Sequence, residues 1–188
     1  MGELPKRKSI RLKSYDYKQA GVYFVTLCTH DRKTAFGEIR DGAMHANALG
    51  EAVIEEWFRS EEIRAEIELD EFVLMPNHIH GLVLIVPVGA HGDAPVHGDA
   101  PAHGDAPAPD SPCLHRAPRS LGSFIAGFKR ASAKRINAAR GTPAGPVWQR
   151  NYFERVIRND DGLRKAREYI VNNPLQWELD HENPNRIR

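Results

Sequence analysis

Residues 72–86 have the sequence FVLMPNHIHGLVLIV, in which two apolar segments flank a short polar turn. Apolar runs interrupted by Pro-Asn predict two β-strands, expected at 67–75 and 79–86. Side chains two residues apart in a strand point to the same face, with Cα atoms ~7 Å apart. His78 and His80 can therefore converge on one metal ion. The simpler alternative is a histidine pair at the core edge that only makes hydrogen bonds.

The segments around this hairpin predict an α+β fold. Residues 21–29 are rich in β-branched and aromatic side chains and predict a first strand. The apolar spacing in 47–64 and 120–140 predicts amphipathic helices. A fourth strand is expected at 147–158 and a third helix at 159–174. The order corresponds to a ferredoxin-like βαββαβ core with an antiparallel sheet and one appended C-terminal helix, and it puts both histidines on a central strand.

The appended helix carries Tyr169 and Asn173, which are four residues apart and share a helix face. Two neutral imidazoles and one amide oxygen leave positions open for phosphate and water, a donor set that favours Mg²⁺ or Mn²⁺. A tyrosine hydroxyl is a poor nucleophile at neutral pH, and a metal can offset this by polarising a phosphoryl group. The pattern predicts metal-assisted phosphoryl transfer. The alternative roles are packing for Tyr169 and helix termination for Asn173.

The net charge of +1 conceals a strong segregation of charge. Residues 111–153 contain no acid, and residues 6–13 are basic beside the single Glu3. Such local basic fields attract polyanions, although a solvated helix face is the common alternative. The residues expected to contact DNA are Arg7, Lys8, Arg11, Lys129, Arg130, Lys134, Arg135 and Arg150.

Length and composition predict one domain in a reducing cytosol. Two cysteines give no disulfide framework, and the N-terminus lacks the apolar run of a signal peptide. We expect a basic arm at 1–20, a catalytic domain at 21–177 and a tail at 178–188. The domain is interrupted by a low-complexity insert at 88–118, where the unit HGDAP occurs three times within 90–108. Gly, Pro and Ala at this density predict a disordered spacer.

Six motifs resemble the REP-associated tyrosine transposases, a branch of the single-tyrosine HUH endonucleases. The resemblance implies His78 and His80 as metal ligands, Asn173 as a third, and Tyr169 as the nucleophile that forms a 5′-phosphotyrosine. It also implies single-stranded DNA near a hairpin as substrate. The HGDAP repeat departs from the family pattern. The matching segments are RKSIRL at 7–12, YFVT at 23–26, MPNHIH at 75–80, WQR at 148–150, RVIRN at 155–159 and YIVNNP at 169–174.

Two other functions agree with the same sequence. One is a catalytically idle or host-adopted DNA-binding protein of transposase descent. The other is a metal-dependent hydrolase that uses water, with Tyr169 in a structural role. With the resemblance, we expect a bacterial, nucleoid-associated protein of the cytoplasm that binds single-stranded or hairpin DNA and no membrane. A homodimer is compatible with the sequence, which also leaves a monomer open.

Overall fold

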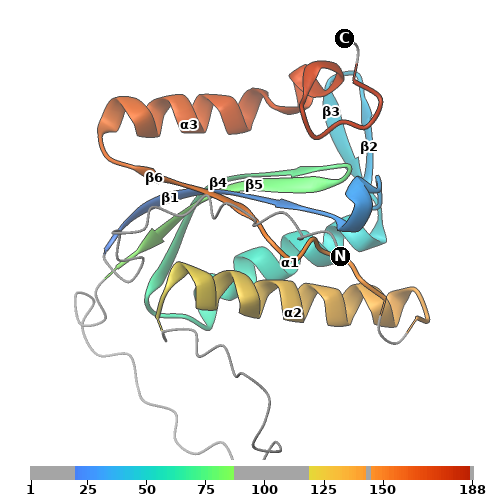
Figure 1. Cartoon of the computed structure of the whole chain (residues 1–188), viewed down its shortest axis with the longest axis horizontal. Coiled ribbons are helices and arrows are strands. Elements are labelled where there is room, and N and C mark those ends of the chain that lie inside the picture. The colour runs from blue at the N-terminus through green and yellow to red at the C-terminus, as the bar shows by residue number, and fades with distance from the viewer. Residues whose placement is uncertain (1–19, 87–118, 143–144, 187–188) are drawn as a thin grey trace, which may run out of the picture.

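The computed structural model describes residues 20–86, 119–142 and 145–186 (Figure 1). All but the last residue of the predicted arm at 1–20 lies outside the described residues, and so does the whole predicted insert at 88–118. The expectations for those two segments therefore stay predictions.

Four antiparallel strands form the main sheet: β1 (Gly21–Cys28), β4 (Ile67–Met75), β5 (His78–Ile85) and β6 (Phe153–Ile157). Their order across the sheet is β4-β5-β1-β6. Counted along the chain, these are the second, third, first and fourth strands of the sheet, which is the ferredoxin-like order. The α+β fold with an antiparallel sheet confirms the prediction from the sequence. Strand β5 lies inside the sheet, between β4 and β1.

Helices cover both faces of this sheet (Figure 1). Helices α1 (Ala48–Glu62) and α2 (Leu121–Ala139) pack against each other on one face. Helix α3 (Asp160–Asn172) crosses the other face and contacts β4 and β5. Each helix starts at a side chain that accepts a hydrogen bond from the first turn, which satisfies a backbone N–H that has no partner inside the helix. The capping residues are Asn47, Ser120 and Asn159.

The structure adds four short elements that the sequence did not predict. A hairpin of β2 (Gly37–Arg40) and β3 (Ala43–Ala46) follows β1 and forms a separate two-stranded sheet. The 3₁₀ helix η1 (His30–Arg32) precedes this hairpin, and η2 (Pro174–Leu179) follows α3. All four are too short to show a hydrophobic period.

The fourth strand of the main sheet is shorter than the predicted 147–158, because β6 begins only at Phe153. The Lys129 amine donates hydrogen bonds to the backbone carbonyls of Gln149 and Asn151, at 2.9 and 3.0 Å. These two bonds fasten the segment to α2 just before the ladder of β6 begins. Ahead of β6 the segment is thus anchored to α2, and Trp148 forms one isolated antiparallel bridge to Thr29, just beyond the end of β1.

The main core lies between the sheet and the α1–α2 pair. Strand β5 alternates: Ile79 points into this core, and the two histidines on either side of it point to the α3 face. Gly81 also lies on the core side, where a Cβ atom would come within 2.4 Å of the Trp57 ring of α1. The absence of a side chain at Gly81 lets α1 pack closely against the strand that carries the site.

Candidate metal and tyrosine site

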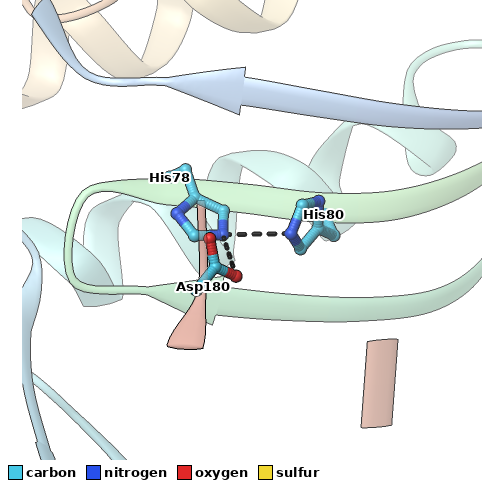
Figure 2. Close-up of side chains that lie close together, drawn as sticks. All are labelled: His78, His80 and Asp180. Carbon is cyan, nitrogen blue, oxygen red and sulfur yellow. Dashed lines mark hydrogen bonds and ion pairs between the residues drawn. The ribbon is translucent and has the colours of Figure 1, made fainter. Parts of the chain in front are cut away.

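Two buried histidine rings meet on the α3 face of the sheet (Figure 2). His78 and His80 lie on β5 with their Nε2 atoms 3.0 Å apart, and their exposed fractions are 0% and 3%. A hydrogen bond between two Nε2 atoms needs one proton, whereas a shared metal ion needs two lone pairs. The protonation of each ring therefore determines what the pair can do.

Asn77 fixes the tautomer of His78. The Asn77 amide nitrogen donates to the backbone carbonyls of Arg32 and Glu182, at 3.1 and 2.6 Å. These two bonds turn the Asn77 amide oxygen toward His78 Nδ1, at 2.8 Å. Because this oxygen only accepts hydrogen bonds, His78 Nδ1 carries the proton. The lone pair of His78 then lies on Nε2, where it faces His80.

The other ring has a matching environment. His80 Nδ1 lies 2.8 Å from the hydroxyl of Thr26, its neighbour across β1. A hydroxyl accepts as well as donates, so His80 can also be protonated on Nδ1. In that tautomer both Nε2 lone pairs point at the same place and repel each other unless a cation lies there. Metal-binding histidines commonly have such a partner on the second ring nitrogen.

Burial lowers the pKa of both imidazoles below the ordinary value of 6.5. At His78 the loss of solvent is the largest cause, opposed in part by the nearby Asp180 carboxylate. At His80 the loss of solvent is reinforced by His78 itself. Both rings are therefore neutral at pH 7, which is the form that binds metal ions.

Asp180 supplies a carboxylate that the sequence did not single out. Its Oδ2 atom lies 4.0 Å from His78 Nε2, and one ligand atom each from His78, His80 and Asp180 lie within 4.8 Å of one another. The Glu182 backbone N–H donates to Asp180 Oδ1 at 2.6 Å, and Asn173 Nδ2 donates to Oδ2 at 3.0 Å. A buried carboxylate beside two neutral imidazoles carries a negative charge that a divalent cation would balance.

Asn173, the predicted third ligand, lies at the end of α3 and is 2% exposed. Its amide nitrogen bonds to Asp180, while its Oδ1 atom is buried and has no hydrogen-bond partner within the described chain. An orphaned buried oxygen is a group that a metal ion can satisfy. The donor chemistry thus fits a divalent cation. The residues that could hold it are His78, His80, Asp180 and Asn173.

Tyr169 reaches the same place from α3. Its hydroxyl lies 3.5 Å from His80 Nε2, and its ring packs edge-on against Phe24 with centroids 5.8 Å apart. Burial, together with the carboxylates of Asp180 and Glu182, raises the pKa of the hydroxyl above 10. The group is protonated at neutral pH and would have to lose its proton to act as a nucleophile. The structure thus brings Tyr169, Asn173 and both histidines together.

The four α2 residues predicted to contact DNA lie on the face of the sheet opposite α3 (Figure 1). Arg135 forms ion pairs with Glu55 and Glu56 of α1. Arg130 and Lys134 are exposed. A phosphate contact by Arg135 would have to compete with two carboxylates, whereas Arg130 and Lys134 face solvent. The four residues are Lys129, Arg130, Lys134 and Arg135.

The remaining predicted DNA contacts lie elsewhere. Arg150 is exposed in the segment that precedes β6. Arg7, Lys8 and Arg11 belong to the part of the arm outside the described residues. Among the described residues, none of the predicted basic contacts forms a hydrogen bond or ion pair with His78 or His80, and their role in DNA binding stays a prediction.

Sequence comparison places the chain in a family of proteins. No family model matches the chain. An uncharacterised protein of Haemophilus influenzae is 34% identical over 175 residues, which cover 93% of this chain and 91% of that protein. The chain belongs to the same family as this Haemophilus protein.

Comparison with solved structures shows which known fold the chain resembles. A REP-associated tyrosine transposase bound to a REP hairpin aligns with a TM-score of 0.53 and 18% identity, over 90% of this chain and 74% of that one. The chain therefore has a transposase-like fold. A proposed transposase of Deinococcus radiodurans aligns with a TM-score of 0.41 and 17% identity, over 87% of this chain and 97% of that one. Among the described residues, no helix is long and apolar enough to cross a membrane.

Proposed function

We propose that this chain is a metal-dependent endonuclease and transposase that cuts and rejoins single-stranded DNA at hairpin-associated sites. The Tyr169 hydroxyl, 3.5 Å from a nitrogen of the His78–His80–Asp180 group, is the observation that carries the proposal. Support also comes from the fold, which resembles that of a transposase bound to a REP hairpin. Hairpin DNA is the partner that we propose, and the nucleoid of a bacterial cytoplasm is the location.

The proposed reaction is an in-line exchange of phosphodiester bonds. Tyr169 Oη forms a bond to phosphorus as the bond from phosphorus to the 3′ oxygen breaks. The tyrosine proton passes to water, and the departing 3′ oxygen takes a proton from water. The products are a free 3′ hydroxyl and a 5′-phosphotyrosine. A phosphodiester replaces a phosphodiester, so a 3′ hydroxyl can reverse the reaction and rejoin the DNA without ATP.

The buried polar residues hold the cofactor in this proposal. His78, His80, Asp180 and Asn173 bind Mg²⁺ or Mn²⁺, and a bound ion would neutralise charge on the phosphoryl oxygens. Asn77 keeps the His78 lone pair on the metal side through its hydrogen bond to Nδ1. Because Asp180 takes part, we also propose that the catalytic unit extends beyond the boundary at residue 177 that the sequence indicated.

Covalent capture of DNA tests this function. Labelled hairpin oligonucleotides incubated with the protein and Mn²⁺ should give a protein–DNA adduct on a denaturing gel, and excess chelator should prevent it. The Tyr169→Phe variant keeps the ring and should form no adduct while binding DNA within a few-fold of the unaltered protein. Cleavage without an adduct would indicate a hydrolase, and binding without cleavage would indicate an idle DNA-binding protein.

A further inference from the structure

An aromatic surface continues from the site toward the β6 edge of the sheet. Helix α3 packs on β4 and β5, whereas β6 is the strand at the opposite edge of the sheet. Phe153 of β6 is 43% exposed, and Phe24 of β1 is partly buried beside it. A single exposed phenylalanine is common on protein surfaces. The Phe153 ring differs from such a residue because ring contacts through Phe24 link it to His80 and Tyr169.

Phe24 makes that connection through three ring contacts. Its centroid lies 6.4 Å from that of Phe153, 5.3 Å from that of His80 and 5.8 Å from that of Tyr169. The strand register places Phe153 directly opposite Thr26, which bonds to His80. Rings thus extend without interruption from the proposed nucleophile to the edge of the sheet.

Positive charge accompanies the rings on this edge. Arg155 lies opposite Phe24 and, two residues from Phe153, on the same face of the sheet. It is exposed and makes no hydrogen bond or ion pair with any residue that the structure describes. Arg158 follows on the same edge and is also exposed, whereas Glu154 alternates to the other face. The aromatic surface therefore complements a ligand with flat rings and negative charge.

We propose that Phe153, Phe24 and Arg155 form a binding subsite for the nucleotide next to the phosphate that Tyr169 attacks. The base stacks on the Phe153 ring, and Arg155 contacts the adjoining phosphate. An unpaired base is required, since a base inside a duplex has both faces covered. This inference rests on the proposed function, because it assumes single-stranded DNA in the site, and it names the residues that hold that strand.

Binding of two oligonucleotides in the absence of cleavage tests the subsite. The Tyr169→Phe protein is titrated with a thymidine 12-mer and with a 12-mer of abasic deoxyribose phosphates, which carries the same charge without bases. We expect tighter binding of the thymidine strand. Phe153→Leu keeps apolar bulk and should weaken binding of the thymidine strand about 5- to 150-fold, the loss for one base–aromatic stack. It should leave abasic binding unchanged, and Phe153→Trp should restore the preference.

Two further variants separate the subsite from general effects. Arg155→Gln should weaken both strands by the same factor and reduce the salt dependence, as expected for a phosphate contact. Phe58→Leu is the matched control, because Phe58 is 48% exposed on α1, on the other face of the sheet, and should affect neither strand. An undiminished thymidine preference in Phe153→Leu would overturn the subsite, as would equal binding of both strands by the starting protein. Adduct formation is measured separately, so the catalytic proposal can fail or survive independently.

Discussion

At the scale of single residues, Asn77 has a larger effect on the site than its position in a turn suggests. It bonds to Arg32 and Glu182, which come from opposite ends of the described chain, and it sets the proton on His78. One amide thus joins the C-terminal segment to the sheet and determines which imidazole nitrogen is available. The metal-binding capacity of the pair depends on this neighbour as much as on the histidines.

Asp180 provides a residue-scale prediction about metal binding. Asp180→Asn keeps the size of the side chain and an oxygen that can accept from the Glu182 N–H, but it removes the buried charge. Mn²⁺ affinity measured by calorimetry should fall at least about tenfold, since even changes beyond the direct ligands cost that much. Asp161→Asn, an exposed and ion-paired residue of α3, is the control. Unchanged affinity in Asp180→Asn would remove Asp180 from the ligand set.

Gly81 provides a second prediction at this scale, on stability. A Cβ atom at position 81 would lie 2.4 Å from the Trp57 ring, so Gly81→Ala must displace α1 or strain the strand. Denaturant unfolding should show a loss of about 1–3 kcal/mol, typical of overpacking. Gly145→Ala is the control, because the nearest neighbour of its added Cβ would be 3.5 Å away. Equal stability of the two variants would show that α1 does not need this close approach.

At the scale of elements, the long helices and the strands of the main sheet were predictable from hydrophobic period and caps. The β2–β3 hairpin was missed although Asp41-Gly42 stands at its turn, with φ of 50° and 73°. Two successive residues with positive φ form the tight hairpin turn that Asp-Gly favours. The Asp-Gly dipeptide was the sequence feature that could have predicted the hairpin. The four-residue strands on either side were too short to show the alternating pattern of a strand.

The site was predictable only where local pattern placed its residues. His78 and His80 share a strand face, and Tyr169 and Asn173 share a helix face, so strand and helix geometry group them in pairs. Asp180 lies beyond Pro174, after a 3₁₀ helix without a hydrophobic period. Its approach to His78 depends on how that segment folds back over the sheet, which no local pattern specifies.

Helix α2 gives a prediction about elements, because its cations differ in their surroundings. Lys134→Gln should weaken binding of all hairpins alike and reduce the salt dependence, because Lys134 is exposed to solvent. Arg135→Gln should lower thermal stability, because Arg135 pairs with Glu55 and Glu56 across the α1–α2 contact. It should weaken DNA binding less than Lys134→Gln does. A larger loss of DNA affinity for Arg135→Gln than for Lys134→Gln would contradict this division.

At the scale of the whole molecule, the sheet has the main hydrophobic core on one face and the proposed catalytic site on the other. The α1–α2 pair covers one face of the sheet and α3 covers the other (Figure 1). The main core lies on the α1–α2 face, and the buried histidines lie on the α3 face. Strand β5 contributes to both faces, because its side chains point alternately into the core and into the site.

The repeat at 90–108 gives a prediction for the whole chain. Replacing it with a short Gly/Ser linker should leave the unfolding midpoint and DNA cleavage close to those of the full chain, since loop length changes stability only slowly. Denaturant unfolding and the hairpin cleavage assay measure the two properties. A shortened protein that folds but fails to bind hairpin DNA would assign the repeat a role in recognition.

The position of the covalent bond tests the central claim most directly. The protein is incubated with Mn²⁺ and hairpin DNA, the adduct is digested with nuclease and trypsin, and the peptide that carries the remaining nucleotide is identified by mass spectrometry. We predict that a 5′-linked nucleotide is attached to Tyr169 and that Tyr152→Phe, a matched substitution, leaves its yield unchanged. Attachment to any other residue, or cleavage that yields no nucleotide-bearing peptide, would contradict the assignment of Tyr169 as the nucleophile.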